Sequence, residues 1–217
     1  MSRMNAVQRH LLASVACTLT DRTVHVWQID YRRAQRREPL VATLAAYLEI
    51  DAMEVRLVEG EYGRPVLAAE HVTTLDFNWS HSGDRALIAI ARGIAPGIDI
   101  ERVRARPRAL LVADRYFRSD EIAMLTALSE AQRSLAFLQL WTAKEAVLKA
   151  LGRGIAFGLD RLEIAHAERG PTLRWLDGED TAQWQLHRVD VGEGYLGALA
   201  WRGGTRGVSV RTLEAAA

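Results

Sequence analysis

A helix-spaced stripe of side chains between residues 129 and 152 places the strongest constraint on how this chain can fold. The sequence Ser-Glu-Ala-Gln at 129–132 has the pattern of a capping box, and Gly152 follows the stripe as a stop signal. A helix of this length must pack against other elements. The positions that share the predicted inward face are Leu135, Leu138, Trp141, Glu145, Leu148 and Lys149. The two charged residues on this apolar face are the first candidates for a functional site.

Short strand patterns surround this helix. The segments rich in β-branched, aromatic or continuous apolar residues are 24–30, 55–58, 65–67, 77–82, 86–91, 97–101, 162–165, 184–189, 195–201 and 208–212. Further helices are expected from Pro39 to about Ile50 and from about Ser119. Because Gly83 and Asp84 form a turn signal, we expect the strands on either side of them to pair as a hairpin.

The order of these elements repeats along the chain, as a helix followed by antiparallel strands. We therefore expect an α+β fold of two similar subdomains, each with a helix packed on a small, mainly antiparallel sheet. The expected subdomains are residues 1–97 and 98–217, with residues 1–20 as an extension of unknown role. No Pro- or Ser-rich linker separates them, so we expect them to pack as one unit.

The composition disfavours several classes of protein. Twenty-eight basic against 27 acidic residues leave a net charge of +1, whereas proteins that bind the nucleic-acid backbone usually have a basic excess. No apolar stretch approaches the ~20 residues that span a bilayer, and the apolar region within residues 3–17 is too short and polar for a signal peptide. The single cysteine, Cys17, cannot form an internal disulfide. We expect a cytoplasmic protein without nucleic-acid or membrane partners.

The two lysines of the chain lie together. The other 26 basic residues are arginines, but Lys144 and Lys149 fall within six residues of each other. A lysine ammonium is a compact, rotatable cation, whereas the guanidinium group is planar. The pattern indicates that an ammonium group is required in this segment.

Three carboxylates form a candidate metal site. Asp99 and Glu101 are two residues apart on a predicted strand, so their side chains share one face about 7 Å apart. Glu145 adds a third carboxylate beside a lysine. Such hard oxygen ligands suit Mg²⁺ when substrate phosphates and water complete the octahedron. Two simpler interpretations stay open: the strand pair as a solvated face, and Glu145 with Lys149 as a surface ion pair.

Five segments, in their order along the chain, resemble the 4′-phosphopantetheinyl transferases. They are Gly63-Arg64-Pro65, residues 77–82 (FNWSHS), residues 97–101 (GIDIE), Phe117 with Glu121, and residues 141–152 (WTAKEAVLKALG). The resemblance covers about residues 24–201, and the length is similar to the Sfp-type class, in which one chain carries both halves of the site. It implies two subdomains related by a pseudo-twofold, an active site at their interface, and a monomer.

The resemblance also implies a reaction. The family transfers the 4′-phosphopantetheine arm of coenzyme A to a serine of an apo acyl or peptidyl carrier protein and releases adenosine 3′,5′-bisphosphate. By position, Asp99, Glu101 and Glu145 resemble ligands of Mg²⁺, or alternatively Mn²⁺. The carrier is expected to be acidic and to contact apolar side chains near Phe117 together with Arg102, Arg104, Arg106, Arg108, Arg115 and Arg118. Whether the carrier serves fatty-acid, polyketide or nonribosomal-peptide synthesis stays open.

The remaining roles follow the same resemblance. Lys149 would stabilise the leaving group, and Glu145 is the candidate base, with a water that it orients or a metal-bound water as alternatives. The residues expected to contact coenzyme A are Arg36, Arg37, Arg64, Ser80, His81, Lys144 and Lys149. Arg64, Ser80 and His81 resemble the positions that hold the 3′-phosphate and neighbouring oxygens. The interval 31–38 is shorter than is usual in the family, so which of its arginines reaches the nucleotide stays open.

Two other functions stay open on the sequence alone. A Mg²⁺-dependent nuclease could use the same acidic residues, although the near-neutral net charge disfavours it. A non-catalytic carrier-binding relative would keep the fold without the activity. The full set Asp99, Glu101, Glu145 and Lys149 favours an enzyme.

Overall fold

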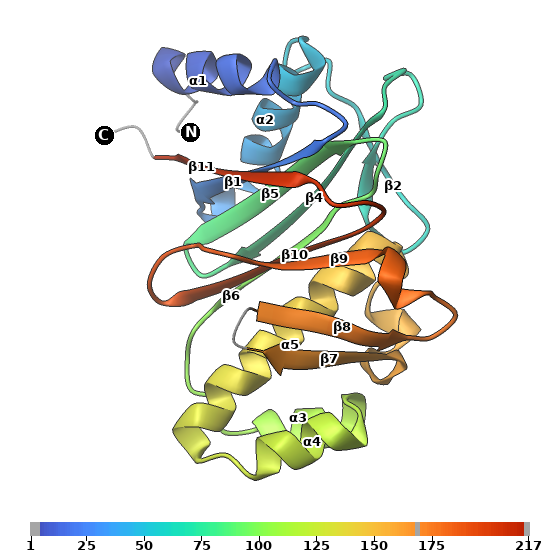
Figure 1. The fold of residues 1–217 in the computed structure, drawn as a ribbon. Helices are drawn as coiled ribbons and strands as arrows, with labels where there is room; N and C mark the ends of the chain where they lie inside the picture. The colour runs from blue at the N-terminus through green and yellow to red at the C-terminus, as the bar shows by residue number, and fades with distance from the viewer. Residues whose placement is uncertain (1–4, 168–169, 215–217) are drawn as a thin grey trace.

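The computed structural model describes residues 5–167 and 170–214 and has a mixed α+β fold (Figure 1). In chain order its main elements are α1 (Ala6–Ala16), β1 (Thr23–Asp30), α2 (Glu38–Leu48), β2 (Leu57–Glu59), β3 (Pro65–Leu67), β4 (Leu75–Ser82), β5 (Arg85–Arg92), β6 (Gly97–Arg102), α3 (Ala109–Tyr116), α4 (Ser119–Thr126), α5 (Glu130–Leu151), β7 (Leu162–Ala167), β8 (Gly170–Leu176), β9 (Trp184–Val189), β10 (Tyr195–Arg202) and β11 (Gly207–Leu213). None of the helices in these described ranges has the length and apolar character needed to cross a membrane.

Two sheets share one strand order. The first runs β11-β1-β5-β4 and the second β6-β10-β9. Strand β1 relates to β5 and β4 as β6 relates to β10 and β9, and all four of these pairings are antiparallel. The predicted hairpin is confirmed, because β4 and β5 pair up to Ser82 opposite Arg85. The last strand differs from the expected division at residue 97: β11 pairs in parallel with β1 and so completes the first sheet.

The two sheets share a core. Val24, Leu87, Ile98, Ile100 and Leu199 belong to one buried apolar cluster to which both sheets contribute. Helix α2 packs on the other face of the first sheet, and α5 packs on the other face of the second, as Figure 1 shows. Strand β5 is therefore buried on both faces, which explains its continuous apolar sequence.

The N-terminal extension forms α1, which the sequence analysis does not predict. Leu12 of this helix is fully buried in the core that α2 covers. The Gln8 side chain donates a hydrogen bond to the carbonyl of Glu214, just after β11. Helix α1 thus closes the first core beside the final strand.

Helix α5 begins and ends close to the predicted limits, but its inward face is broader than one stripe. Leu135 is 40% exposed, so its predicted inward position is wrong, whereas Phe137 and Leu140 are buried. The reason is that α5 contacts β6 and β10 as well as α3, α4 and β7. The capping box also does not form, because the Ser129 hydroxyl donates to the side chain of Gln132 instead of accepting from the backbone.

Candidate active site

Gly97 brings strand β6 close to helix α5. A Cβ at this position would lie 2.0 Å from the carbonyl oxygen of Ala146 and 2.3 Å from the amide nitrogen of Ala150. Only glycine permits this backbone approach. The approach places Asp99, two residues along the strand, opposite the last turns of α5.

Asp99 is the centre of the polar contacts at this crossing. It is 5% exposed, and its Oδ1 atom accepts from Lys149 Nζ and from Ser80 Oγ, both at 2.7 Å. Lys149 Nζ also donates to the carbonyl of Ile98 at 3.1 Å. The other oxygen, Asp99 Oδ2, is enclosed and has no hydrogen-bond partner among the described residues.

Glu101 lies on the same face of β6, as the alternation of the strand predicts. Its Oε2 atom accepts from Ser82 Oγ at 3.1 Å and from Arg106 Nη2 at 3.2 Å. Burial, and secondarily the charge of Asp99, raise the pKa of Glu101, while Arg106 opposes the shift. Glu101 is thus held beside a second acid.

Glu145 completes the group of acids from the helix side. It is buried, and its Oε1 atom has no partner among the described residues. Burial, together with the charges of Asp99 and Glu101, raises the pKa of Glu145 to about 7, and Lys149 opposes this shift. Asp99, Glu101, Glu145 and Lys149 therefore form one electrostatic cluster, which we call the acidic cluster.

The donor set of the acidic cluster fits a hard divalent cation. Buried carboxylate oxygens without a partner are costly unless a cation or a proton joins them, and Asp99 Oδ2 and Glu145 Oε1 are both of this kind. Within residues 5–167 and 170–214, no group of three or more His, Cys, Asp and Glu side chains is already arranged to hold a metal ion. The metal assignment therefore stays a prediction, supported by the chemistry of the oxygens.

His81 follows Ser80 on β4, and the alternation of the strand directs its side chain to the other face. There its ring centroid lies 4.7 Å from that of Tyr31, in a stacked arrangement, and 5.3 Å from that of Trp79. Partial burial, Lys149 and Arg33 together lower the pKa of His81. Arg33, one of the arginines in the interval 31–38 whose contacts the sequence leaves open, is thus close enough to act on His81. Arg36 and Arg37, by contrast, are exposed just before α2.

Lys144 lies away from the acidic cluster, which does not support its expected position near a diphosphate. Its Nζ atom is 2.8 Å from Glu121 Oε2, 2.8 Å from the carbonyl of Leu159 and 2.6 Å from that of Leu162. The side chain is 0% exposed. Burial lowers the pKa of Lys144, and the charge of Glu121 opposes this shift. All three donors of this ammonium are therefore used in the core between α5, α4 and the start of β7.

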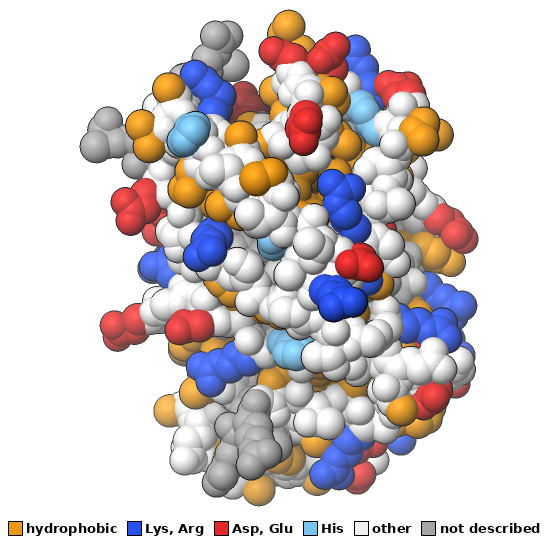
Figure 2. Space-filling view, turned by 45° about the horizontal axis from the view of Figure 1, so that its top comes forward, with side chains coloured by type: hydrophobic (Ala, Val, Ile, Leu, Met, Phe, Trp, Pro, Cys, Tyr) orange, Lys and Arg blue, Asp and Glu red, His pale blue; other side chains and the backbone are white. Residues whose placement is uncertain are grey.

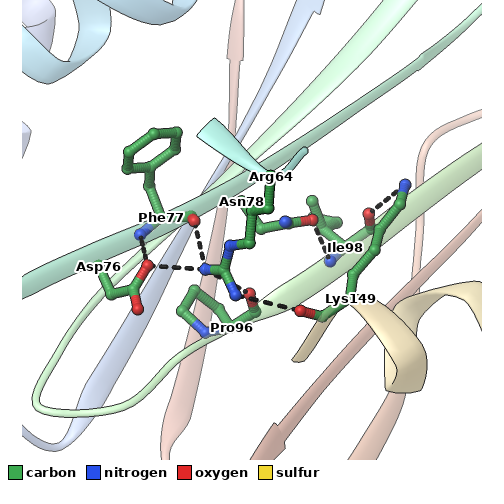
Figure 3. Close-up of polar contacts among 7 residues, drawn as sticks. All are labelled: Arg64, Asp76, Phe77, Asn78, Pro96, Ile98 and Lys149. Atoms are coloured by element: carbon green, nitrogen blue, oxygen red, sulfur yellow. Dashed lines mark hydrogen bonds and ion pairs between the residues drawn. The ribbon is translucent and has the colours of Figure 1, made fainter. Parts of the chain in front are cut away.

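Arg64 also has partners that the resemblance does not imply. Its guanidinium group donates to the carboxylate of Asp76 and to the carbonyls of Phe77, Pro96 and Lys149 (Figure 3). Ser80 therefore contacts the acidic cluster through Asp99, whereas Arg64 is bound within the fold.

Asn78 and Ser82 lie in the segment 77–82 and contribute to the site, although no role was expected for either residue. Asn78 is buried, and its Oδ1 accepts from the amide of Ile98 at 3.0 Å. Ser82 binds Glu101. Residues 78, 80 and 82 alternate along β4, so the period of two could have shown that all three side chains face β6.

An open pocket of about 440 Å³ adjoins the acidic cluster at Glu101. Its other walls come from Arg104, Ala105, Arg106, Pro107, Arg108, Ala109, Val112, Phe137 and Trp141. The pocket is therefore apolar on the side of α3 and α5 and basic along the segment after β6. Elsewhere, on the face shown in Figure 2, basic and acidic side chains are interspersed.

Comparisons with known proteins identify the family. The model of the 4′-phosphopantetheinyl transferase superfamily matches residues 95–200. The chain is 34% identical over 165 residues to 4′-phosphopantetheinyl transferase psf-1 of Bacillus pumilus (75% of this chain, 68% of that protein). It is 36% identical over 165 residues to HetI of Nostoc sp. (76% and 68%), and 28% identical over 152 residues to Sfp of Bacillus subtilis (70% and 66%).

These matches cover about two thirds of the length of each relative. The match to the family model, residues 95–200, includes β6 and α5, the two elements that carry the acidic cluster. The matches leave no support for the nuclease alternative. The chain belongs to the 4′-phosphopantetheinyl transferase superfamily, in the Sfp-type class that its motifs indicate.

Proposed function

We propose that this protein transfers the 4′-phosphopantetheine arm of coenzyme A to a serine of an apo carrier protein, with Mg²⁺, and releases adenosine 3′,5′-bisphosphate. The observation that carries the proposal is the pair of enclosed, unpartnered oxygens, Asp99 Oδ2 and Glu145 Oε1, beside the ammonium of Lys149. Family membership supplies the reaction class. In this proposal the two halves, with their repeated strand order, are related by a pseudo-twofold and the site lies between them.

Asp99, Glu101 and Glu145 are the residues that would hold Mg²⁺, with Mn²⁺ as an alternative. When bound, such an ion offsets negative charge on a diphosphate and on its leaving oxygen. Ser80 and Ser82 orient two of these carboxylates by hydrogen bonds. The carboxylates are thereby fixed before the substrate arrives.

Two residues of α5, Glu145 and Lys149, would take part in the transfer reaction. The serine oxygen of the carrier forms a bond to the β-phosphorus of coenzyme A, and the bond from that phosphorus to the bridging oxygen breaks. Glu145 is the candidate acceptor of the serine proton, with a water that it orients or a metal-bound water as alternatives. The ammonium of Lys149 stabilises the charge that develops on the departing 5′-phosphate.

Ser80 and His81 are the proposed contacts to the 3′-phosphate and its neighbours. Arg33 is a further candidate contact, because its charge acts on His81 together with that of Lys149. Arg36 and Arg37 stay candidates for the same nucleotide from the exposed segment before α2.

The carrier protein is proposed to dock over the pocket beside Glu101. Arg104 and Arg108 are exposed at its wall, Arg102 and Arg115 are exposed nearby in sequence, and all four would attract an acidic carrier. Phe117 itself is buried, but Leu111 is 71% exposed on α3. Arg106 is paired with Glu101, so it would couple docking to the acidic cluster.

The test is transfer itself. The protein is incubated with coenzyme A, Mg²⁺ and apo carriers from fatty-acid, polyketide and nonribosomal-peptide systems, and mass spectrometry measures the phosphopantetheine added to each. We expect Asp99→Asn to lower the rate on the order of 10³-fold. Asp51→Asn, at an exposed turn, is the matched control and should not change the rate. Near-normal transfer by Asp99→Asn would refute the assignment of the site.

A further inference from the structure

Arg64 joins three parts of the molecule that are distant in sequence (Figure 3). Its Nη2 atom is 2.7 Å from Asp76 Oδ1 and 2.6 Å from the carbonyl of Phe77, both on β4. The same nitrogen lies 3.4 Å from the carbonyl of Pro96, just before β6. Nη1 donates to the carbonyl of Lys149 at 3.1 Å, in the last turn of α5. One guanidinium group therefore ties the first sheet to both elements that carry the acidic cluster.

These contacts leave little of the guanidinium group for a phosphate. Nη2 is shared among three acceptors, and Nε is enclosed without a partner among the described residues. The carboxylate of Asp76 already balances the charge of Arg64. A phosphate could bind in the same plane only by displacing this carboxylate or the carbonyls.

The contact with Lys149 connects Arg64 to the acidic cluster. The backbone carbonyl of Lys149 is bound to Arg64, and its ammonium is bound to Asp99 and to the carbonyl of Ile98. Asn78 holds the amide of the same Ile98. The Lys149 carbonyl also accepts from the amide of Gly152, the residue that ends the helix, at 3.2 Å, and a cation is favourable at a helix C-terminus. Both ends of Lys149 are therefore fixed, one by Arg64 and the other by β6.

We propose that Arg64 is a positioning residue: it holds the last turn of α5 against β4 and the entry to β6, and so sets the Lys149 ammonium at Asp99, instead of binding the 3′-phosphate of coenzyme A. The inference rests on the proposed function, because it assigns a role in the same site. It replaces the role that the resemblance implies for this position.

Replacing Arg64 by lysine separates the two roles. A lysine keeps the positive charge and can bind a phosphate, but its single nitrogen cannot reach acceptors on both sides of a planar fork. The positioning role predicts that Arg64→Lys lowers kcat and leaves the KM for coenzyme A nearly unchanged. Arg56→Lys, an exposed arginine before β2, is the matched control and should behave like the wild type.

The deciding assay compares coenzyme A with 3′-dephospho-coenzyme A as donors. For Arg64→Lys and Arg64→Ala we expect kcat/KM to fall with both donors by the same factor, on the order of 10²-fold. The ratio between the donors then stays at its wild-type value. A ratio that collapses toward one in the Arg64 variants would show that Arg64 reads the 3′-phosphate and would overturn the proposal.

Hydrogen exchange tests the positioning role without any activity. Arg64→Lys should speed amide exchange in residues 147–152 and 97–99 and leave strand β9 unchanged. Asp76→Ala should do the same, and the double variant should add less than the sum of the two, because both remove one network. Unchanged exchange at the end of α5 would overturn the proposal. If the wild type transfers nothing from coenzyme A, the proposed function fails, and this measurement still decides the role of Arg64.

Discussion

Lys144 and Lys149 lie about 1.4 turns apart on α5, yet their surroundings are opposite. The Lys149 side chain is 24% exposed and pairs with Asp99 in the acidic cluster. The Lys144 side chain is 0% exposed and pairs with Glu121, which is itself enclosed. One ammonium faces the site, and the other closes a contact between α5, α4 and the start of β7.

The two environments explain why this chain uses lysine at these positions and arginine elsewhere. At both positions a compact ammonium contacts acceptors in several directions, which a planar guanidinium could not do in the same space. Around Lys144 the acceptors are complete, so the side chain holds the fold together. Around Lys149 the partner carboxylate keeps a free oxygen, Asp99 Oδ2, so the pair remains able to bind something further.

If Lys149 serves the reaction and Lys144 the fold, removal of the Lys149 ammonium should reduce activity much more than stability. Lys149→Met should lower phosphopantetheine transfer on the order of 10³-fold, because charge on the leaving phosphate loses its cation. The free energy of unfolding, measured in urea, should change by less than about 2 kcal/mol, since the pair is partly exposed. Transfer within tenfold of the wild type would contradict the assigned role.

Removal of Lys144 should have the opposite signature. Lys144→Met leaves the Glu121 carboxylate buried without its cation, which costs about 3–5 kcal/mol of unfolding free energy. The double variant Lys144→Met/Glu121→Gln should recover part of this loss, because it removes the unpaired charge. A single variant that unfolds at the wild-type urea concentration would show that the pair does not hold the fold.

Gly97→Ala tests whether the approach of β6 to α5 serves the Lys149 end of the helix. The added Cβ would meet the backbone of Ala146 and Ala150, so we expect a loss of about 1–3 kcal/mol together with lower transfer. Gly204→Ala is the matched control, because nothing lies within 4 Å of its Cβ position. Equal stability of the two variants would mean that the crossing relaxes without cost.

The sequence predicts those features of Asp99, Glu101 and α5 that depend on neighbouring residues, but not those that depend on contacts between distant segments. The alternation of Asp99 and Glu101 with Ile98 and Ile100, and the limits of α5, follow from local periodicity, and the structure shows them as expected. The burial of Lys144 depends on Glu121 and on carbonyls after α5, which no periodicity within the helix reveals.

Two further features depend on contacts between distant segments. Strand β11 pairs in parallel with β1 across most of the chain, and no turn signal links two such strands. Arg64 lies in a motif that resembles a phosphate contact, but its four acceptors come from segments 12 to 85 residues away. Local patterns could not place either feature.

Glu145 lies between the two lysines in sequence and belongs to the acidic cluster, so the stability of the protein should depend weakly on pH and Mg²⁺. The pKa of Glu145 is raised from 4.5 to about 7 in the folded protein. Its contribution to the free energy of unfolding is therefore fully present below pH 4.5 and is lost as the pH rises through 7. If Glu145 is a Mg²⁺ ligand as proposed, Mg²⁺ should restore this stability, since the ion binds the charged form.

Thermal unfolding with and without Mg²⁺ measures this effect. We expect Mg²⁺ to raise the Tm by a few degrees at pH 8 and by much less at pH 5.5, because protonation of Glu145 competes with the ion. Glu145→Gln should abolish most of this pH dependence, whereas Lys144→Met should keep it, since Lys144 does not contact the acidic cluster. An equal Mg²⁺ effect at both pH values in the wild type would show that Glu145 is not a ligand, and the contrast between the two sides of α5 would then rest on Lys149 and Asp99 alone.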